Sequence, residues 1–147
     1  MPGKDARVEK LLALTSLRIH PNKYIVATSP TSTINSIKQR LADIDSQYWS
    51  IISSEEEISL ILPANTWAQM SSYLPKAKIE EDYRLITLDA PTSWDTPGYL
   101  TKILSILTQE NITVGVISGF SRHHLIIKSK NLLQAIDSLN QTIEFSQ

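Results

Sequence analysis

The sequence predicts an α+β protein made of two modules, each with the element order β-α-β-β-α-β. Two observations lead to this prediction. A segment that starts at Tyr48 can be laid without a gap over a segment that starts at Thr113, which indicates an internal repeat. In each copy, runs with strand periodicity alternate with runs with helix periodicity, as is typical of layered α+β domains. The chain has 147 residues, enough for one ordinary domain or two small modules that share a core.

The repeat is carried by matched positions. Ser53 falls on Ser118 and Leu60 falls on Leu125, and both pairs are 65 positions apart. Upstream, the letters SPTS and APTS match at a separation of 61 positions, so the second copy has gained four residues. We place these extra residues in the turn at 94–98. A duplicated module with one enlarged turn suggests a structural half and a ligand-carrying half, although coincidence among β-branched residues is the alternative explanation.

The first module follows from short periodic runs. Residues 33–45 carry apolar side chains at helical spacing, with Ser and Thr available to cap the helix. Two β-branched runs around a polar turn at 53–56 predict a hairpin. Residues 76–82 are charged and lack apolar periodicity, so we expect a linker there. The expected elements are strands at 14–19 and 23–28, a helix at 33–45, strands at 49–53 and 57–62, and a helix at 65–74.

The first helix of the second module is the best defined element. Positions i, i+3, i+4 and i+7 of one face are apolar. We expect Thr96 to cap the helix, Pro97 to take its first position, where the missing N–H has no cost, and Asn111 to end it. The face consists of Leu100, Ile103, Leu104 and Leu107.

The remaining runs complete the second module. The resulting order is the split β-α-β of a ferredoxin-like sandwich, with an antiparallel sheet and helices on one face. The expected strands lie at 83–88, 112–118, 123–128 and 142–145, and the second helix lies at 130–141. The expected boundaries are a lead-in at 1–13, a first module at 14–75, a linker at 76–82 and a second module at 83–147.

Composition excludes several classes of protein. The net charge is −1 with acidic and basic residues mixed, so the basic face that nucleic acids require is not expected. The chain has no cysteine, which removes disulfides and thiolate chemistry. No run approaches the ~18 apolar residues of a membrane span, and the charged start at 4–10 does not resemble a signal peptide. We therefore expect a cytoplasmic protein that binds neither nucleic acid nor membrane.

No catalytic or metal-binding pattern is visible. The sequence has no nucleophile elbow and no pair of carboxylates placed for acid–base work. His123 and His124 are adjacent, so on a strand they face opposite sides of the sheet and cannot chelate one metal ion. We interpret them as ordinary strand residues. The prediction is a protein that is not an enzyme and that uses no metal and no cofactor.

The segment from 95 to 112 resembles the signature of ACT domains. That signature runs Asp-x-Pro-Gly-x-Leu, followed by an apolar helix and Asn-Ile. The resemblance extends over 83–145 and, through the repeat, over 14–75. Over its whole length the chain resembles the small tandem-ACT proteins related to the CASTOR-type cytosolic arginine sensors. The matching residues here are Asp95, Pro97, Gly98, Leu100, Asn111 and Ile112.

The resemblance implies a regulatory or sensor protein. ACT domains bind amino acids and allosterically control enzymes or partner proteins, often as homodimers with sites at interfaces. We therefore expect an amino acid or similar small zwitterion as ligand, a homodimer, and a regulated partner protein. The arginine sensors carry an acidic residue where this chain has His123, preceded by Arg122. This departure favours a neutral or acidic ligand over arginine.

The chemistry of the turn independently favours a carboxylate site. Amides at the start of a helix lack intrahelical acceptors, and the helix dipole adds positive partial charge. Gly98 lets a ligand approach the backbone, and Asp95 can pair with an α-ammonium group. Trp94 is a candidate pocket wall. The predicted ligand-binding residues are Ser93, Trp94, Asp95, Thr96, Pro97 and Gly98 on the loop, with Val116, Ile117, Ser118, Gly119 and Phe120 on the following strand.

A second hypothesis assumes the same fold but no bound ligand. Asp or Thr before Pro-Gly is also a normal helix cap, which needs no bound molecule. In that case the chain is a protein-interaction or dimerisation module, and its sheet edges recruit the partner.

Overall fold

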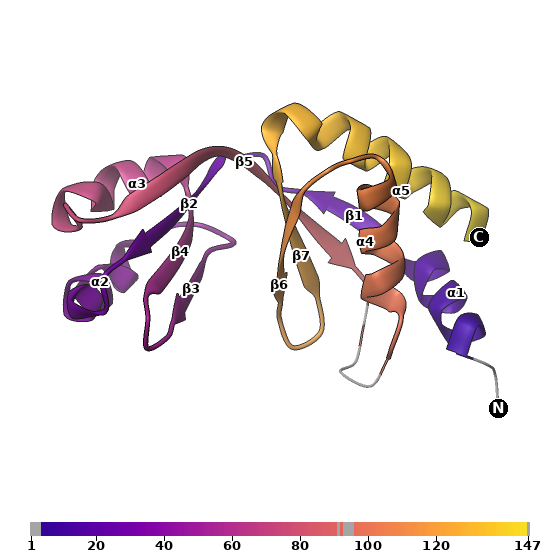
Figure 1. The fold of residues 1–147 in the computed structure, drawn as a ribbon, viewed down its shortest axis with the longest axis horizontal. Coiled ribbons are helices and arrows are strands. Elements are labelled where there is room, and N and C mark those ends of the chain that lie inside the picture. Colours follow the sequence, from indigo (N-terminus) through magenta and orange to yellow (C-terminus); the bar gives the residue numbers. More distant parts are fainter. Residues whose placement is uncertain (1–3, 91, 93–95, 147) are drawn as a thin grey trace. The chain divides into compact units, whose positions relative to one another are not determined.

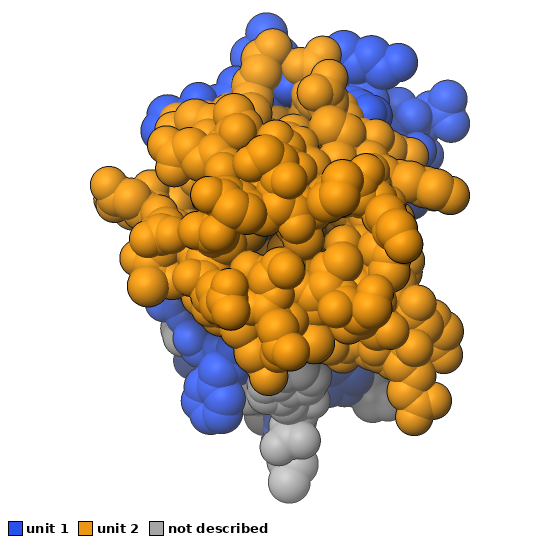
Figure 2. All heavy atoms as spheres, turned by 90° about the vertical axis from the view of Figure 1, so that its left-hand side faces the viewer, with its two compact units in different colours: residues 1–21, 84–147 blue, residues 22–83 orange. Residues whose placement is uncertain are grey.

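The computed structural model describes residues 4–90, 92 and 96–146. The chain divides into two compact units, one formed by residues 22–83 and the other by residues 1–21 together with 84–147. Figure 2 shows the two units in different colours. One unit is thus inserted into the sequence of the other. This division differs from the expected boundaries at 14–75 and 83–147, because the first strand of the chain belongs to the C-terminal unit.

The inserted unit, residues 22–83, contains a complete β-α-β-β-α-β order. Its sheet is antiparallel, with the strand order β3-β4-β2-β5. Buried side chains from both helices and from alternate strand positions, including Ile37, Leu60 and Trp67, form its core. The elements are β2 (Tyr24–Ser29), α2 (Ile34–Arg40), β3 (Ser50–Ser53), β4 (Ile58–Pro63), α3 (Ala64–Met70) and the first half of β5 (Lys78–Asp89).

The expected linker at 76–82 is wrong, because strand β5 begins at Lys78. Its backbone pairs with β2, with Ala27 opposite Ile79 and Thr28 opposite Lys78. The side chains of residues 78–82 are nevertheless exposed, so this part of the strand has no apolar periodicity. Backbone pairing without side-chain burial leaves no hydrophobic pattern in the sequence.

The second unit takes a strand from the beginning of the chain. Strand β1 pairs antiparallel with the second half of β5, with Ser16 opposite Asp89 and Ile19 opposite Ile86. The sheet of this unit has the order β1-β5-β7-β6. It contains α1 (Lys4–Leu14), β1 (Ser16–Ile19), α4 (Tyr99–Gln109), β6 (Val114–Ser118), β7 (His123–Lys128) and α5 (Leu132–Ser146) besides the second half of β5.

The strand expected at 142–145 is wrong, because α5 continues through these residues to Ser146. Ile143 is buried, and it lies four residues after Leu139 on the same helical face. The position beside β5 that such a strand would occupy is already filled by β1. The lead-in expected at 1–13 forms helix α1, which packs against α4 and α5 (Figure 1).

The core of this unit joins its three helices to one face of its sheet. Val8 and Leu12 of α1 and Ile103 of α4 lie in the same cluster as Leu88 and Leu125 of the strands. At the end of α4, Asn111 takes the left-handed conformation with φ 56°, and the Ile112 amide donates to the Leu107 carbonyl at 3.0 Å. The prediction that Asn111 ends the helix is confirmed, as is the antiparallel ferredoxin-like fold.

Candidate functional site

A pocket opens at the N-terminal end of α4, within the unit formed by residues 1–21 and 84–147. Its volume is about 240 Å³, below the roughly 300–1,000 Å³ of typical small-molecule pockets. One wall is the chain before α4 and the first turn of that helix, and the other is the β6–β7 hairpin. The lining residues are Thr92, Thr96 and Gly98 before the helix, Tyr99, Leu100 and Thr101 in its first turn, and Ser118, Gly119, Phe120 and His123 of the hairpin.

The helix wall presents backbone amides. Helix α4 begins at Tyr99 with Gly98 as its cap residue, and the Lys102 amide donates to the Gly98 carbonyl at 3.0 Å. The amides of the first turn precede this first intrahelical bond, so they have no acceptor within the helix. Within the described residues, no side chain makes a capping hydrogen bond at this helix start. This wall therefore offers hydrogen-bond donors and positive partial charge.

The prediction that Pro97 occupies the first helical position is wrong, because the helix begins two residues later. The reason is the backbone of Gly98, whose φ of 93° and ψ of −17° turn the chain into the helix. A side chain at this position is strained by its positive φ, and a Cβ atom would stand 3.4 Å from Cγ2 of Val8. The positive φ, rather than the contact with Val8, therefore makes glycine the favoured residue at this position.

Hydrogen bonds at the hairpin tip hold the two walls together. The Gly119 amide donates to the Arg122 carbonyl at 2.8 Å, which closes the β6–β7 turn. Thr92 donates twice to the Ser121 carbonyl, from its amide and from its hydroxyl, each at 3.2 Å. The segment before α4 is therefore tied directly to the tip of the hairpin.

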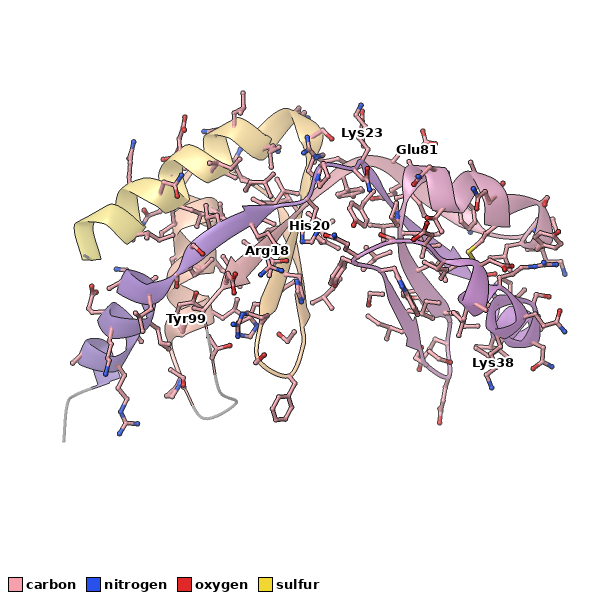
Figure 3. All side chains as sticks on the ribbon, turned by 180° about the vertical axis from the view of Figure 1, so that it is seen from behind. Arg18, His20, Lys23, Lys38, Glu81 and Tyr99 are labelled. Atoms are coloured by element: carbon pink, nitrogen blue, oxygen red, sulfur yellow. The ribbon has the colours of Figure 1, made fainter. Side chains whose placement is uncertain are left out.

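His123 forms part of the hairpin wall and is held on two sides. Its Nδ1 lies 2.8 Å from the Ser118 hydroxyl oxygen, and its ring stacks on that of Tyr99 with centroids 6.2 Å apart. The Tyr99 hydroxyl donates to Thr15 at 2.7 Å, because the Thr15 hydroxyl itself donates to the Leu11 carbonyl at 2.6 Å. Figure 3 labels Tyr99, which connects the pocket to α1. Burial lowers the pKa of His123, so its imidazole is uncharged at neutral pH.

The nearest cation along the hairpin is already paired. Arg122 donates from Nε to a carboxylate oxygen of Asp89 at 2.7 Å, and Arg18 donates to the other oxygen at 2.7 Å. The hydrogen bond from Arg122 and then that from Arg18 lower the pKa of the Asp89 carboxyl group. This carboxylate therefore stays ionised at neutral pH and engages both guanidinium groups.

The other two histidines lie on the opposite face of this sheet. His20 Nε2 and His124 Nδ1 lie 2.8 Å and 2.9 Å from the same hydroxyl oxygen, that of Thr87. Burial, followed by the charge of Arg18, lowers the pKa of His20. Burial and, to a smaller extent, the neighbouring His20 lower the pKa of His124 from 6.5 to about 4. No group of three or more potential metal ligands exists among the described residues.

These shifts predict that acidification destabilises the protein. The unfolded chain binds protons on histidine near pH 6.5, whereas folded His124 does so only near pH 4. The stabilising contribution is thus fully present above pH 6.5 and is lost as the pH falls toward 4. We expect a loss of about 1–2 kcal/mol, discounted for the partial exposure of the ring. Thermal unfolding between pH 5 and 8 measures this loss of stability. The His124→Gln variant should show a weaker dependence of stability on pH than the wild-type protein. Equal pH dependence in the two proteins would contradict the assignment of the effect to His124.

Five of the predicted ligand-binding residues line this one pocket: Thr96, Gly98, Ser118, Gly119 and Phe120. Pro97 lines a separate open groove with Val8 and Lys102. Val116 packs against the hydrophobic core, and Ile117 is not part of the pocket wall. Ser93, Trp94 and Asp95 lie outside the described residues.

Sequence reasoning missed the other half of the wall. The residues in the first turn of α4 line the pocket because they directly follow Gly98, the glycine of the Asp-x-Pro-Gly-x-Leu signature. His123 was interpreted as an ordinary strand residue. Its register opposite Ser118 places it at the pocket, and that pairing already follows from the strands expected at 112–118 and 123–128. The missed residues are Thr92, Tyr99, Leu100, Thr101 and His123.

A comparison with protein families finds a similarity in this region. Residues 78–141, from the start of β5 into α5, match the family model described as "ACT domain". This part of the chain is therefore similar to ACT domains. The match includes the glycine-started helix and the hairpin that form the pocket, so the pocket lies within the matched segment.

Solved structures share the fold over most of the chain. A protein of unknown function from Vibrio cholerae, described as a possible transport protein, has a TM-score of 0.72 and 19% identity, covering 96% of this chain and 99% of its own. A protein from Agrobacterium tumefaciens has a TM-score of 0.67 and 21% identity, covering 87% and 88%. The ligand-free regulatory subunit of aspartate kinase from Thermus thermophilus has a TM-score of 0.69 and 10% identity, covering 88% and 98%.

The search of curated proteins finds no match to this sequence. In the part of the chain that the structure describes, every helix is too short or too polar to span a membrane.

Proposed function

We propose that this chain is a non-enzymatic, amino-acid-binding regulatory or sensor protein. It is built from two ACT-type modules, one inserted between β1 and β5 of the other. The observation that carries the proposal is the pocket at the start of α4, where amides without acceptors in the helix face a polar hairpin wall within the segment that matches the ACT domain model. Because the site is small, it suits a single amino acid or similar zwitterion.

The ligand's carboxylate binds at the first turn of α4. Helix N-termini bind anions through their amides and dipole, without the need for a basic side chain. Ser118 and the backbone of Gly119 supply further hydrogen bonds from the opposite wall. The assignment of Asp95 as partner of the α-ammonium group rests on the sequence alone, since Asp95 lies outside the described residues.

The resemblance to a regulatory subunit of aspartate kinase supports a regulatory role. We propose that the protein acts in the cytoplasm as a homodimer and that ligand binding controls a partner protein. Kinship with the cytosolic arginine sensors stays a prediction from the sequence. The unit formed by residues 22–83 repeats the element order of the ACT domain, and we assign it a structural role.

Thermal unfolding with and without pooled amino acids tests the proposal. A ligand at 100 times its dissociation constant adds about 2.7 kcal/mol of stability, which shifts the unfolding midpoint by several degrees. Titration calorimetry with the single members of an active pool then identifies the ligand. We expect Gly98→Ala to abolish the shift, because a Cβ at positive φ distorts the helix start.

Gly115→Ala is the matched control for that variant. Gly115 lies on β6 outside the pocket, and a Cβ atom there makes only an ordinary contact, 3.8 Å from Ile126. It should keep the ligand-dependent shift. If no amino acid changes the midpoint of the wild-type protein, the amino-acid site does not exist.

One observation favours the alternative, an interaction module without a ligand. Phe120 at the hairpin tip is 90% exposed, and such an isolated aromatic side chain is a common anchor of protein interfaces. Sedimentation at several concentrations in the absence of amino acids, with Phe120→Ser as the variant, tests this role.

A further inference from the structure

The pocket wall carries no fixed charge among its described residues. It consists of hydroxyl, backbone, aromatic and aliphatic groups and one imidazole. A charged group placed in a partly enclosed site loses hydration, and this loss is recovered only if a partner of opposite charge stands within reach. The backbone amides of α4 provide such a partner for one carboxylate. The described wall offers none for a second charge, on the side chain of the ligand.

The cationic side chains near the pocket do not supply a partner for a charged ligand side chain either. Arg122 follows the hairpin tip, but its guanidinium group is bonded to Asp89 at 2.7 Å, and Arg18 shares the same carboxylate. Lys102 lines the separate groove beside α1. An acidic side chain in the pocket would have to compete with Asp89 for Arg122.

His123 is the one histidine in the described wall, and the geometry fixes its ring. Ser118 engages Nδ1 at 2.8 Å, and the stacked ring of Tyr99 restricts rotation. This leaves Nε2 as the ring nitrogen that can exchange a hydrogen bond with a ligand. A neutral imidazole can present a donor or an acceptor there, according to its tautomer. It therefore complements an uncharged polar side chain through a hydrogen bond, and it places no charge beside an apolar one.

We propose that the ligand is an amino acid with an uncharged side chain, and that His123, positioned by Ser118 and Tyr99, contacts this side chain and sets the preference. The inference rests on the proposed function of the pocket. It extends that function by naming the class of ligand and the residue that selects it.

Ligand pairs of equal shape and different charge provide the test. Asparagine against aspartate, and glutamine against glutamate, should be titrated by calorimetry into the full chain at pH 7.5. Methionine against lysine adds the cationic case. In each pair of ligands that binds, we expect the uncharged member to bind at least about tenfold more tightly than the charged member. The charged side chain loses hydration in the pocket without gaining a partner of opposite charge.

A negative charge introduced at position 123 should change which ligand side chains are preferred. His123→Asp places a carboxylate in the wall, and we expect it to weaken uncharged ligands and to bring lysine or arginine to tighter binding than their uncharged counterparts. His123→Asn is the neutral control and should keep the wild-type order of ligands. The unfolding midpoint of each variant shows whether it is folded. If the aspartate variant does not fold, the asparagine variant and the ligand pairs still test the preference for uncharged side chains.

The outcomes separate the two proposals. If no amino acid binds the wild-type chain, both the site and its preference are overturned. If aspartate, glutamate or lysine binds as tightly as its uncharged counterpart, the preference is overturned while the amino-acid site stands. If His123→Asp leaves the order of ligands unchanged, His123 does not select them.

Discussion

We expect removal of residues 1–21 to unfold residues 84–147 while residues 22–83 stay folded. Strand β1 fills an edge of the C-terminal unit's sheet, where Leu17 pairs with Leu88. Helix α1 contributes the completely buried side chain of Leu12 to the same core. Loss of each large buried side chain costs about 2–5 kcal/mol, and the whole stability of a domain is only about 5–15 kcal/mol.

Hydrogen exchange measures this result unit by unit. In the fragment 22–147, amides of α4 and β7 should exchange at rates close to those of an unfolded chain. The amides of β2 and β4 should remain protected, because the inserted unit contains its own four strands, including the first half of β5. Protection of α4 in this fragment would show that β1 and α1 are dispensable.

The same experiment distinguishes the division into units seen in the structure from the module boundaries predicted from the sequence. If residues 83–147 were a complete module, removal of the preceding residues would leave it folded. The sequence predicted almost every strand and helix, because local periodicity reports which residues are buried. It could not predict that β1 pairs with β5, since such pairing depends on contacts between residues far apart in the chain.

The errors have specific physical causes. The exposed side chains at the start of β5 removed the strand signal at 78–82. The β-branched residues Thr142 and Ile143 favoured a strand locally, yet Ile143 continues the buried face of α5. At the candidate site, motif and dipole arguments located the helix start and the hairpin. The left-handed backbone of Gly98 depends on three-dimensional geometry. The role of His123 in the pocket wall was missed because it was interpreted as an ordinary strand residue, although its pairing with Ser118 follows from the expected strands.

Two leucines of α5 should respond very differently to the same substitution. Leu139 is completely buried in the core of the C-terminal unit, whereas Leu133, six residues earlier on the same helix, is 76% exposed. Leu139→Ala removes buried surface and leaves a cavity, so we expect a loss of about 2–5 kcal/mol in the free energy of unfolding. Leu133→Ala should change it by less than about 0.5 kcal/mol.

Denaturant unfolding followed by helix signal compares the two variants under identical conditions. Helix propensity cannot explain a difference between them, because both exchange the same pair of residues inside the same helix. The buried position also lies in the cluster that includes Ile103 and Leu107 of α4, so a cavity there loosens the helix whose first turn forms the pocket. We therefore expect Leu139→Ala to weaken amino-acid binding as well, and Leu133→Ala to leave it unchanged. Equal losses of stability in the two variants would mean that the core does not extend along this face of α5.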